Sequence, residues 1–173
     1  MTCQVDLELG GLVVPGVARY TFSQTYETFG GETLLRCASG RGIKQRGWIK
    51  LRTQLDGEGW LPEGLTALDY TSQLNLKCVA PRGVMGVGIS NVITIPSARR
   101  SDIDPRGYGI VNGNRVFSTT TMAGDVATVA SVINATGYLV EYWPELTVYA
   151  KEPDTRFTEA NKTYSWSLTA EEV

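Results

Sequence analysis

The stretch GWIKLRTQLDGEGWLPEGLTALDY, residues 47–70, decides the fold class of this chain. Its first half alternates between two sets of positions, as a half-buried β-strand does. The more apolar side carries Ile49, Leu51, Thr53 and Leu55, and the other side carries Trp48, Lys50, Arg52 and Gln54. The alternation stops at Asp56-Gly57, a dipeptide typical of turns, so the strand is predicted to end there. A second Gly-Trp pair follows at Gly59-Trp60.

Segments of the same kind recur on both sides of this block and predict an all-β protein. Residues 4–9 alternate before a Gly-Gly pair, and residues 18–29 form a longer β segment that is predicted to end at Gly30-Gly31. Residues 73–80 alternate again. Short strands separated by Gly-rich turns favour an antiparallel β-sandwich or barrel.

Three further segments refine this expectation. Residues 65–69 are predicted to form one helical turn. Residues 125–133 fit both a helical stripe and a strand, and we favour a strand because the neighbouring segments are strands and Val is β-branched. The final segment, residues 164–168, is expected to pair with an early strand and close the sheet.

Length and charge limit the partners that this chain is expected to have. The 173 residues suffice for one core plus a small subdomain, and the net charge of −2 does not favour nucleic acid or an acidic membrane. The first four residues lead directly into a strand, so we expect no secretion signal. No apolar run approaches the roughly 18 residues that a membrane span needs. We therefore expect a soluble protein made in a cytoplasm.

The three cysteines, Cys3, Cys37 and Cys78, are far apart and show no CxxC spacing. Free buried thiols are the expectation for a chain without a secretion signal. A metal or cluster site shared between chains is the alternative, and it has little support because the chain has no histidine.

Motifs for catalysis or cofactor binding are weak throughout. The chain lacks histidine and a Gly-x-Ser-x-Gly elbow, and Asp56 and Glu58 flank a predicted turn. Residues 102–107 resemble a calcium loop without its full set of acidic ligands, and no helix is expected after the Gly-rich residues 83–88. We therefore expect no enzyme activity, no cofactor and no metal.

The tryptophans suggest contact with a partner. Trp166 lies on the expected core side of its strand, whereas Trp48 and Trp143 alternate with polar residues and are expected to be exposed. Exposed aromatic residues on polar strand faces often mark protein interfaces. The candidate interface residues are Trp48, Lys50, Arg52, Trp60 and Trp143.

Four segments together resemble a known class of proteins. They are VDLELGGLVVPGVARYTFSQTYETFGGETLLR (5–36), IKQRGWIKLRTQLDGEGWLPEGLTALDY (43–70), YWPELTVYA (142–150) and YSWSLTAEEV (164–173). The chain resembles small virion structural proteins of the tail tip or baseplate of long, flexible-tailed (siphovirus-like) bacteriophages and prophages. That resemblance implies a β-rich homo-oligomer, a ring or a trimer around the tail axis. It also implies other tail or baseplate proteins as partners and a location in the virion after synthesis in the host cytoplasm.

The resemblance also suggests a domain organisation. Residues 135–150 look like the central strands of a fibronectin type III-like module, and the composition changes near Pro81. A small inserted β subdomain is therefore expected at residues 89–152. Residues 1–88 would form the main barrel, closed by residues 153–173.

Two other functions compete with a role in assembly. One is a host-surface adhesion or carbohydrate-binding module of the phage tail, with Trp48, Trp143 and Tyr108 as its contact surface. The other is a small peptidoglycan-directed enzyme, which has the least support because the chain has neither histidine nor a clustered pair of acids.

Overall fold

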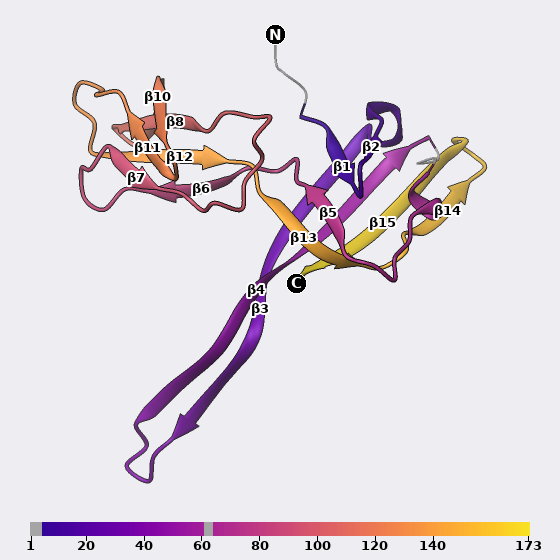
Figure 1. Cartoon of the computed structure of the whole chain (residues 1–173), viewed down its shortest axis with the longest axis horizontal. Coiled ribbons are helices and arrows are strands. Elements are labelled where there is room, and N and C mark those ends of the chain that lie inside the picture. Colours follow the sequence, from indigo (N-terminus) through magenta and orange to yellow (C-terminus); the bar gives the residue numbers. More distant parts are fainter. Residues whose placement is uncertain (1–4, 61–63) are drawn as a thin grey trace. The chain divides into compact units, whose positions relative to one another are not determined.

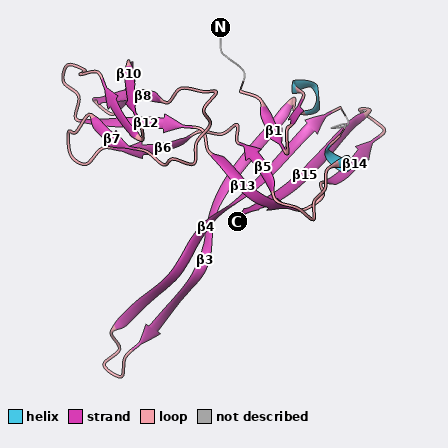
Figure 2. Cartoon of the chain, in the orientation of Figure 1, coloured by secondary structure: helices cyan, strands magenta, loops and turns pink. Residues whose placement is uncertain are grey.

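A computed structural model describes residues 5–60 and 64–173 of the protein, and antiparallel strands dominate it (Figures 1 and 2). The expected all-β class is therefore confirmed. In the described ranges, the helical elements are two short 3-10 helices, η1 (Gly16–Ala18) and η2 (Leu65–Ala67), and η2 confirms the predicted helical turn. No helix in that part of the chain is long and apolar enough to cross a membrane.

The chain divides into two compact units. The outer unit comprises residues 6–76 and 147–173, and the inserted unit comprises residues 77–146 together with Val5. The division expected from the sequence lay at residues 88/89 and 152/153, whereas the units change over at 76/77 and 146/147. One reason is that a strand just before residue 89, β6 (Arg82–Met85), pairs with β12 (Gly137–Tyr142) of the inserted unit.

The outer unit is built on one eight-stranded sheet. Its strand order is β2-β1-β5-β13-β15-β4-β3, and β14 also pairs with β15. The strands are β1 (Leu7–Leu9), β2 (Leu12–Val14), β3 (Thr21–Arg36), β4 (Gly42–Gly59), β5 (Leu74–Lys77), β13 (Glu145–Ala150), β14 (Asp154–Thr158) and β15 (Thr163–Glu172). β5 and β13, which are neighbours in the sheet, carry the chain into and out of the inserted unit.

The sheet of the outer unit is open, so the predicted closed barrel is wrong. Its order begins at β2 and ends at β3, and the described residues contain no pairing between these two edges. The expected pairing of the last strand with an early one is confirmed, because β15 pairs with β4 from Tyr164 to Glu171. The other edge of β15 pairs first with β14 and then with β13.

The core of the outer unit explains why β4 does not stop at Asp56-Gly57. A Cβ on Gly57 would lie 2.5–2.6 Å from three atoms of the Trp166 indole, so only glycine leaves room for that ring. The indole is 2% exposed, and its Nε1 donates a 2.8 Å hydrogen bond to the carbonyl of Ala18. The predicted turn is therefore wrong, and Gly57 is a strand residue that makes room for a core side chain.

The inserted unit is a small sandwich of two antiparallel sheets. One sheet has the order β10-β11-β7 and the other β6-β12-β8-β9. The strands not yet located are β7 (Val92–Thr94), β8 (Arg106–Val111), β9 (Asn114–Ser118), β10 (Thr120–Ala123) and β11 (Val126–Val129). β11 confirms the strand that we favoured within residues 125–133.

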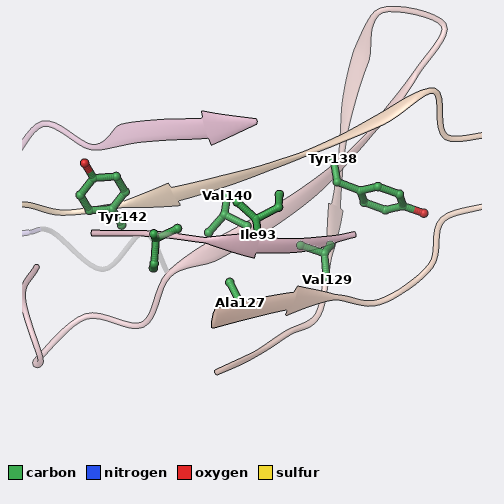
Figure 3. Packing of buried hydrophobic residues seen from close by; sticks show 7 residues of the cluster. Ile93, Ala127, Val129, Tyr138, Val140 and Tyr142 are labelled. Carbon is green, nitrogen blue, oxygen red and sulfur yellow. The ribbon is translucent and has the colours of Figure 1, made fainter. Parts of the chain in front are cut away.

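Side chains from both sheets form the core of the inserted unit. Figure 3 shows Val140 of β12 between Tyr138 and Tyr142, together with Ile93 of β7 and Ala127 of β11. All five belong to one buried cluster. Such alternating inward residues from two facing sheets are the usual basis of a β-sandwich.

One buried cation lies outside this cluster. Arg100 is 5% exposed, and its guanidinium donates two hydrogen bonds of 2.9 and 2.7 Å to the carboxylate of Asp102. A third bond of 3.1 Å goes to the carbonyl of Cys78. A buried charge is tolerated when it is paired and hydrogen-bonded in this way.

Candidate interaction surface

The most exposed part of the outer unit is a two-stranded arm, residues 29–50. β3 and β4 continue together beyond the sheet, and the pairing of β15 with β4 reaches only to Arg52 (Figure 1). Within the described chain, the strands of the arm pair only with each other. All twenty residues from 30 to 49 are exposed, so neither face of the arm is covered.

A β-bulge lets β3 run through Gly30-Gly31, where the sequence predicted its end. Gly30 pairs with Ile49 and Glu32 pairs with Arg46, so Gly31 lies opposite two residues of β4. A Cβ on Gly30 would lie 2.0 Å from the carbonyl oxygen of Trp48. The glycine pair therefore permits a close backbone approach inside one continuous strand.

The arm exposes large apolar side chains on both faces. They are Leu34, Leu35, Ile43, Trp48 and Ile49, which are 42–60% exposed. Leu35 and Ile43 are cross-strand partners, so their side chains lie on the same face. Exposed apolar groups on an uncovered ribbon are typical of a surface that a partner covers.

Aromatic contacts fix the root of the arm. The rings of Phe29 and Trp48 meet edge to face, with centroids 5.4 Å apart. The guanidinium of Arg52 lies 5.0 Å from the centroid of the Phe29 ring on the same face. Its Nε donates a 2.8 Å hydrogen bond to Glu171, and its Nη2 forms an ion pair of 2.7 Å with the same carboxylate. These contacts raise the pKa of Arg52.

A second contact at the root involves the end of β15. The backbone N–H of Leu51 donates a 2.8 Å hydrogen bond to the carboxylate of Glu172. This carboxylate satisfies a β4 amide at the position where β15 no longer supplies a partner strand. Glu172 therefore marks the point where the sheet ends and the arm begins.

The arm is strongly basic. It carries Arg36, Arg41, Lys44, Arg46 and Lys50 and one acid, Glu32, so its net charge is +4. Lys44 and Arg46 lie 2.7 and 3.6 Å from the Glu32 carboxylate, and the hydrogen bond from Lys44 lowers the pKa of that acid. A hollow of about 360 Å³ adjoins these groups at the bulge.

A shallow trough of about 490 Å³ lies at the opposite end of the same strands. Strand register aligns two rows across β3, β4, β15 and β14. The rows are Thr21-Glu58-Ser165-Arg156 and Ser23-Asp56-Ser167-Asp154. The short hydroxyl side chains leave the hollow, and the longer charged groups border it.

The trough is acidic on balance. Its three carboxylates, Asp56, Glu58 and Asp154, face one cation, Arg156. Asp154 lies 3.7 Å from Lys151, whereas Asp56 and Glu58 accept hydrogen bonds from uncharged side chains and form no ion pair in the described part of the chain. These two carboxylates are therefore available to a cation from outside.

The structure separates the five candidate interface residues. Trp48 and Lys50 belong to the arm, and Arg52 lies at its root. Trp60 is 65% exposed and follows the far end of β4. Trp143 belongs to the inserted unit. Within the outer unit, Trp48 and Trp60 lie far apart along β4 and do not share a surface.

The expectation that Trp143 is exposed is wrong. Its side chain is 4% exposed, its Nε1 donates a 2.9 Å hydrogen bond to Val79, and the Arg106 guanidinium lies 5.0 Å from the ring centroid. Tyr108 is half-buried and packs against Phe117. Alternation along β12 suggested an exposed indole, but Trp143 lies just past the end of that strand, where the period of two no longer applies.

Sequence reasoning missed the carboxylates of Glu171 and Glu172 and the apolar pair Leu35 and Ile43. Only the pairing of β15 with β4 brings the two carboxylates to the root of the arm. Alternation did place Trp48, Lys50 and Arg52 on one side of a strand, and in the structure these residues lie at the arm and its root. No local signal shows that the strand around Leu35 lacks a covering layer.

The cysteines and acids show no metal site in residues 5–60 and 64–173. No group of three or more His, Cys, Asp or Glu residues is placed there to hold a metal ion. Cys78 is a buried free thiol, as expected, but Cys37 is exposed near the tip of the arm, so its expected burial is wrong. Cys3 lies outside the described residues.

Comparison with protein-family models finds no matching family, and comparison with curated proteins finds no significant match.

Proposed function

We propose that this protein is a non-catalytic structural component of a bacteriophage tail tip or baseplate, and that it acts by oligomeric assembly through the arm. The observation that carries the proposal is the run of twenty exposed residues, 30–49, in a ribbon that pairs only with itself in the described chain. The resemblance to siphovirus-like tail proteins supplies the biological setting. The protein would be made in the host cytoplasm and would reside in the virion.

The physics of the arm supports a role in assembly. An isolated two-stranded hairpin is at best marginally stable in water, so the free arm gains little from its own hydrogen bonds. Contact with a neighbour would bury Leu34, Leu35 and Ile43, and each fully buried side chain of this size contributes roughly 1.5–3 kcal/mol. An arm that is fixed at its root and uncovered beyond it suits a subunit that is completed by its neighbours.

Shortening the arm tests this proposal. Because Gly30 and Ile49 are paired, residues 31–48 can be replaced by Asn-Gly, a dipeptide that closes a two-residue hairpin. We expect phage that carry this variant to lack complete tails in electron micrographs, while the purified variant keeps the β-type circular dichroism spectrum of the full chain. Complete tails with the shortened arm would contradict the proposal.

A matched variant separates the apolar side chains from the backbone of the arm. Leu35→Thr with Ile43→Thr places a β-branched strand residue at both positions of one cross-strand pair and removes exposed apolar surface. We expect tail assembly to be impaired without loss of folding. If particles with either variant form normally and fail only to adsorb to cells, the adhesion function gains support instead.

The adhesion function depends on a surface of exposed aromatic residues, and most of the expected residues are not well exposed. Of Trp48, Trp143 and Tyr108, only Trp48 is more than half exposed. Trp143 is 4% exposed and so offers little surface to a ligand. Assembly through the arm is therefore the function that we propose.

A further inference from the structure

We propose that the partner of the arm is a second copy of this chain, and that the basic arm of one copy occupies the acidic trough of the next. This inference rests on the proposed function and names the two surfaces that meet. It commits to a head-to-tail contact, in which each copy offers its arm to one neighbour and its trough to another.

Charge supports a second copy as the partner. The whole chain carries −2 and the arm carries +4, which leaves −6 on the remaining residues. Complementary charge of this kind steers association and fixes which surfaces meet. A chain whose arm carries net positive charge and whose remaining residues carry net negative charge is complementary to itself.

The local groups match as well. Near the tip of the arm, Arg41 forms no ion pair within the described residues, and Arg36 donates only to the carbonyl of Gly40 in its own turn. In the trough, Asp56 and Glu58 likewise form no ion pair within the described residues. Contact between copies would pair these groups at a partly desolvated surface.

Geometry excludes docking of the arm in the trough of its own chain. Both features lie on β3 and β4, with Ser23 in the trough and Leu35 near the tip of the arm. Twelve residues of extended strand separate these two positions, which is about 40 Å at roughly 3.3 Å per residue. The arm runs away from the trough along the same strands (Figure 1), so an arm that occupies the trough must come from another molecule.

A head-to-tail contact has a definite consequence for assembly. Such heterologous contacts generate a ring when the rotation between copies closes, and an open filament when it does not. The ring is the arrangement that the proposed function requires around a tail axis.

Charge reversal on each surface tests the inference. Sedimentation velocity over a concentration series measures self-association of the full chain, of Arg41→Glu and of Glu58→Lys. Both residues are exposed, so neither change disturbs the core. We expect each variant to self-associate about tenfold more weakly or worse, because like charges then face each other. Asp104→Lys, an exposed reversal in the inserted unit, is the matched control and should behave as the wild type.

Mixing the two variants provides the decisive observation. In a mixture of Arg41→Glu and Glu58→Lys chains, both contacts between unlike variants pair opposite charges, so the mixture should associate more tightly than either variant alone. Raising the salt concentration from about 50 to about 500 mM should weaken association of the wild type. A mixture that associates no better than its components would overturn the inference, as would a wild-type chain that stays monomeric at all concentrations.

These outcomes are distinct from failure of the proposed function. If the shortened arm abolishes tail assembly while Glu58→Lys has no effect on self-association, the proposed function stands, and the partner of the arm is another protein. If tails form with the shortened arm, the proposed function fails irrespective of the charge variants.

Discussion

The close approach of Gly57 to Trp166 gives a sharp test of how the outer unit is built. In Gly57→Ala the new Cβ would lie 2.5 Å from the indole, so the ring or the strand must shift. Overpacking a core in this way costs about 1–3 kcal/mol. Alanine in a strand gains about 0.5–1 kcal/mol over glycine, which offsets part of that cost. We expect a net loss of about 1–2 kcal/mol in the free energy of unfolding.

Urea denaturation followed by tryptophan fluorescence measures this loss. With a slope of about 2 kcal/mol per M, the midpoint should fall by about 0.5–1 M. Gly47→Ala, in the same strand, is the matched control, because its Cβ would meet only the Gly31 carbonyl at an ordinary 3.6 Å. That variant should stay within about 0.5 kcal/mol of the wild type.

A double-mutant cycle identifies the cause of the loss. Trp166→Leu removes the three indole atoms that the added Cβ would meet, so Gly57→Ala should cost no more than a few tenths of a kcal/mol in that background. Equal losses in both backgrounds would refute the assigned contact. A Gly57→Ala chain as stable as the wild type would refute it directly.

Three further predictions follow from other parts of the fold. Hydrogen exchange should be much faster for the amides of residues 31–48 than for those of the same two strands within the sheet, because the arm opens without disturbing the core; equal protection would show that the free arm is covered. The hydrogen bond from Arg100 lowers the pKa of Asp102. The stability that this pair contributes is therefore present above pH ~4 and is lost as the pH falls through the lowered pKa. Asp102→Asn should reduce the pH dependence of the unfolding midpoint below about pH 5. Burial raises the pKa of Tyr70 to about 12, so the stability that its neutral phenol contributes is present below pH 10 and declines as the pH rises towards 12. The difference between ultraviolet titrations of wild type and Tyr70→Phe should show one phenol that ionises near 12 and not near 10.

Alternation in the sequence correctly predicted strands whose pattern depends only on residues that are adjacent in the sequence. The period of two around Leu51, Thr53 and Leu55 correctly predicted a half-buried strand with Lys50 and Arg52 on the opposite side. The same reasoning resolved residues 125–133 as a strand. These features depend on local periodicity, which each segment carries in itself.

The errors arose where a distant partner decides the role of a residue. Gly57 and Gly30 have the local signal of a turn, but one makes room for Trp166 and the other for the Trp48 carbonyl. Trp143 is buried because groups elsewhere in the inserted unit cover it. A glycine that ends a strand and a glycine that admits a neighbour look the same until the pairing of strands is known.

In the candidate site, too, local features could be predicted from the sequence and features set by distant segments could not. The sequence placed Trp48, Lys50 and Arg52 together on one strand face, and this grouping lies at the arm and its root. The length of the arm could not be predicted, because it depends on where β15 stops pairing with β4. That limit is a tertiary property, set by a segment more than a hundred residues away in the chain.

The position of β15 between β4, β13 and β14 has a consequence for how the protein is made. During synthesis, residues 77–146 leave the ribosome as one contiguous segment and can fold while the next residues are still being translated. Residues 6–76 emerge earlier, yet their strand β4 has no partner on its β15 side until residues 163–172 are made. The inserted unit is therefore expected to fold first and the outer unit last. Until then, one edge of β4 lacks its partner strand. Nascent chains on neighbouring ribosomes of one polysome can therefore associate prematurely through this edge.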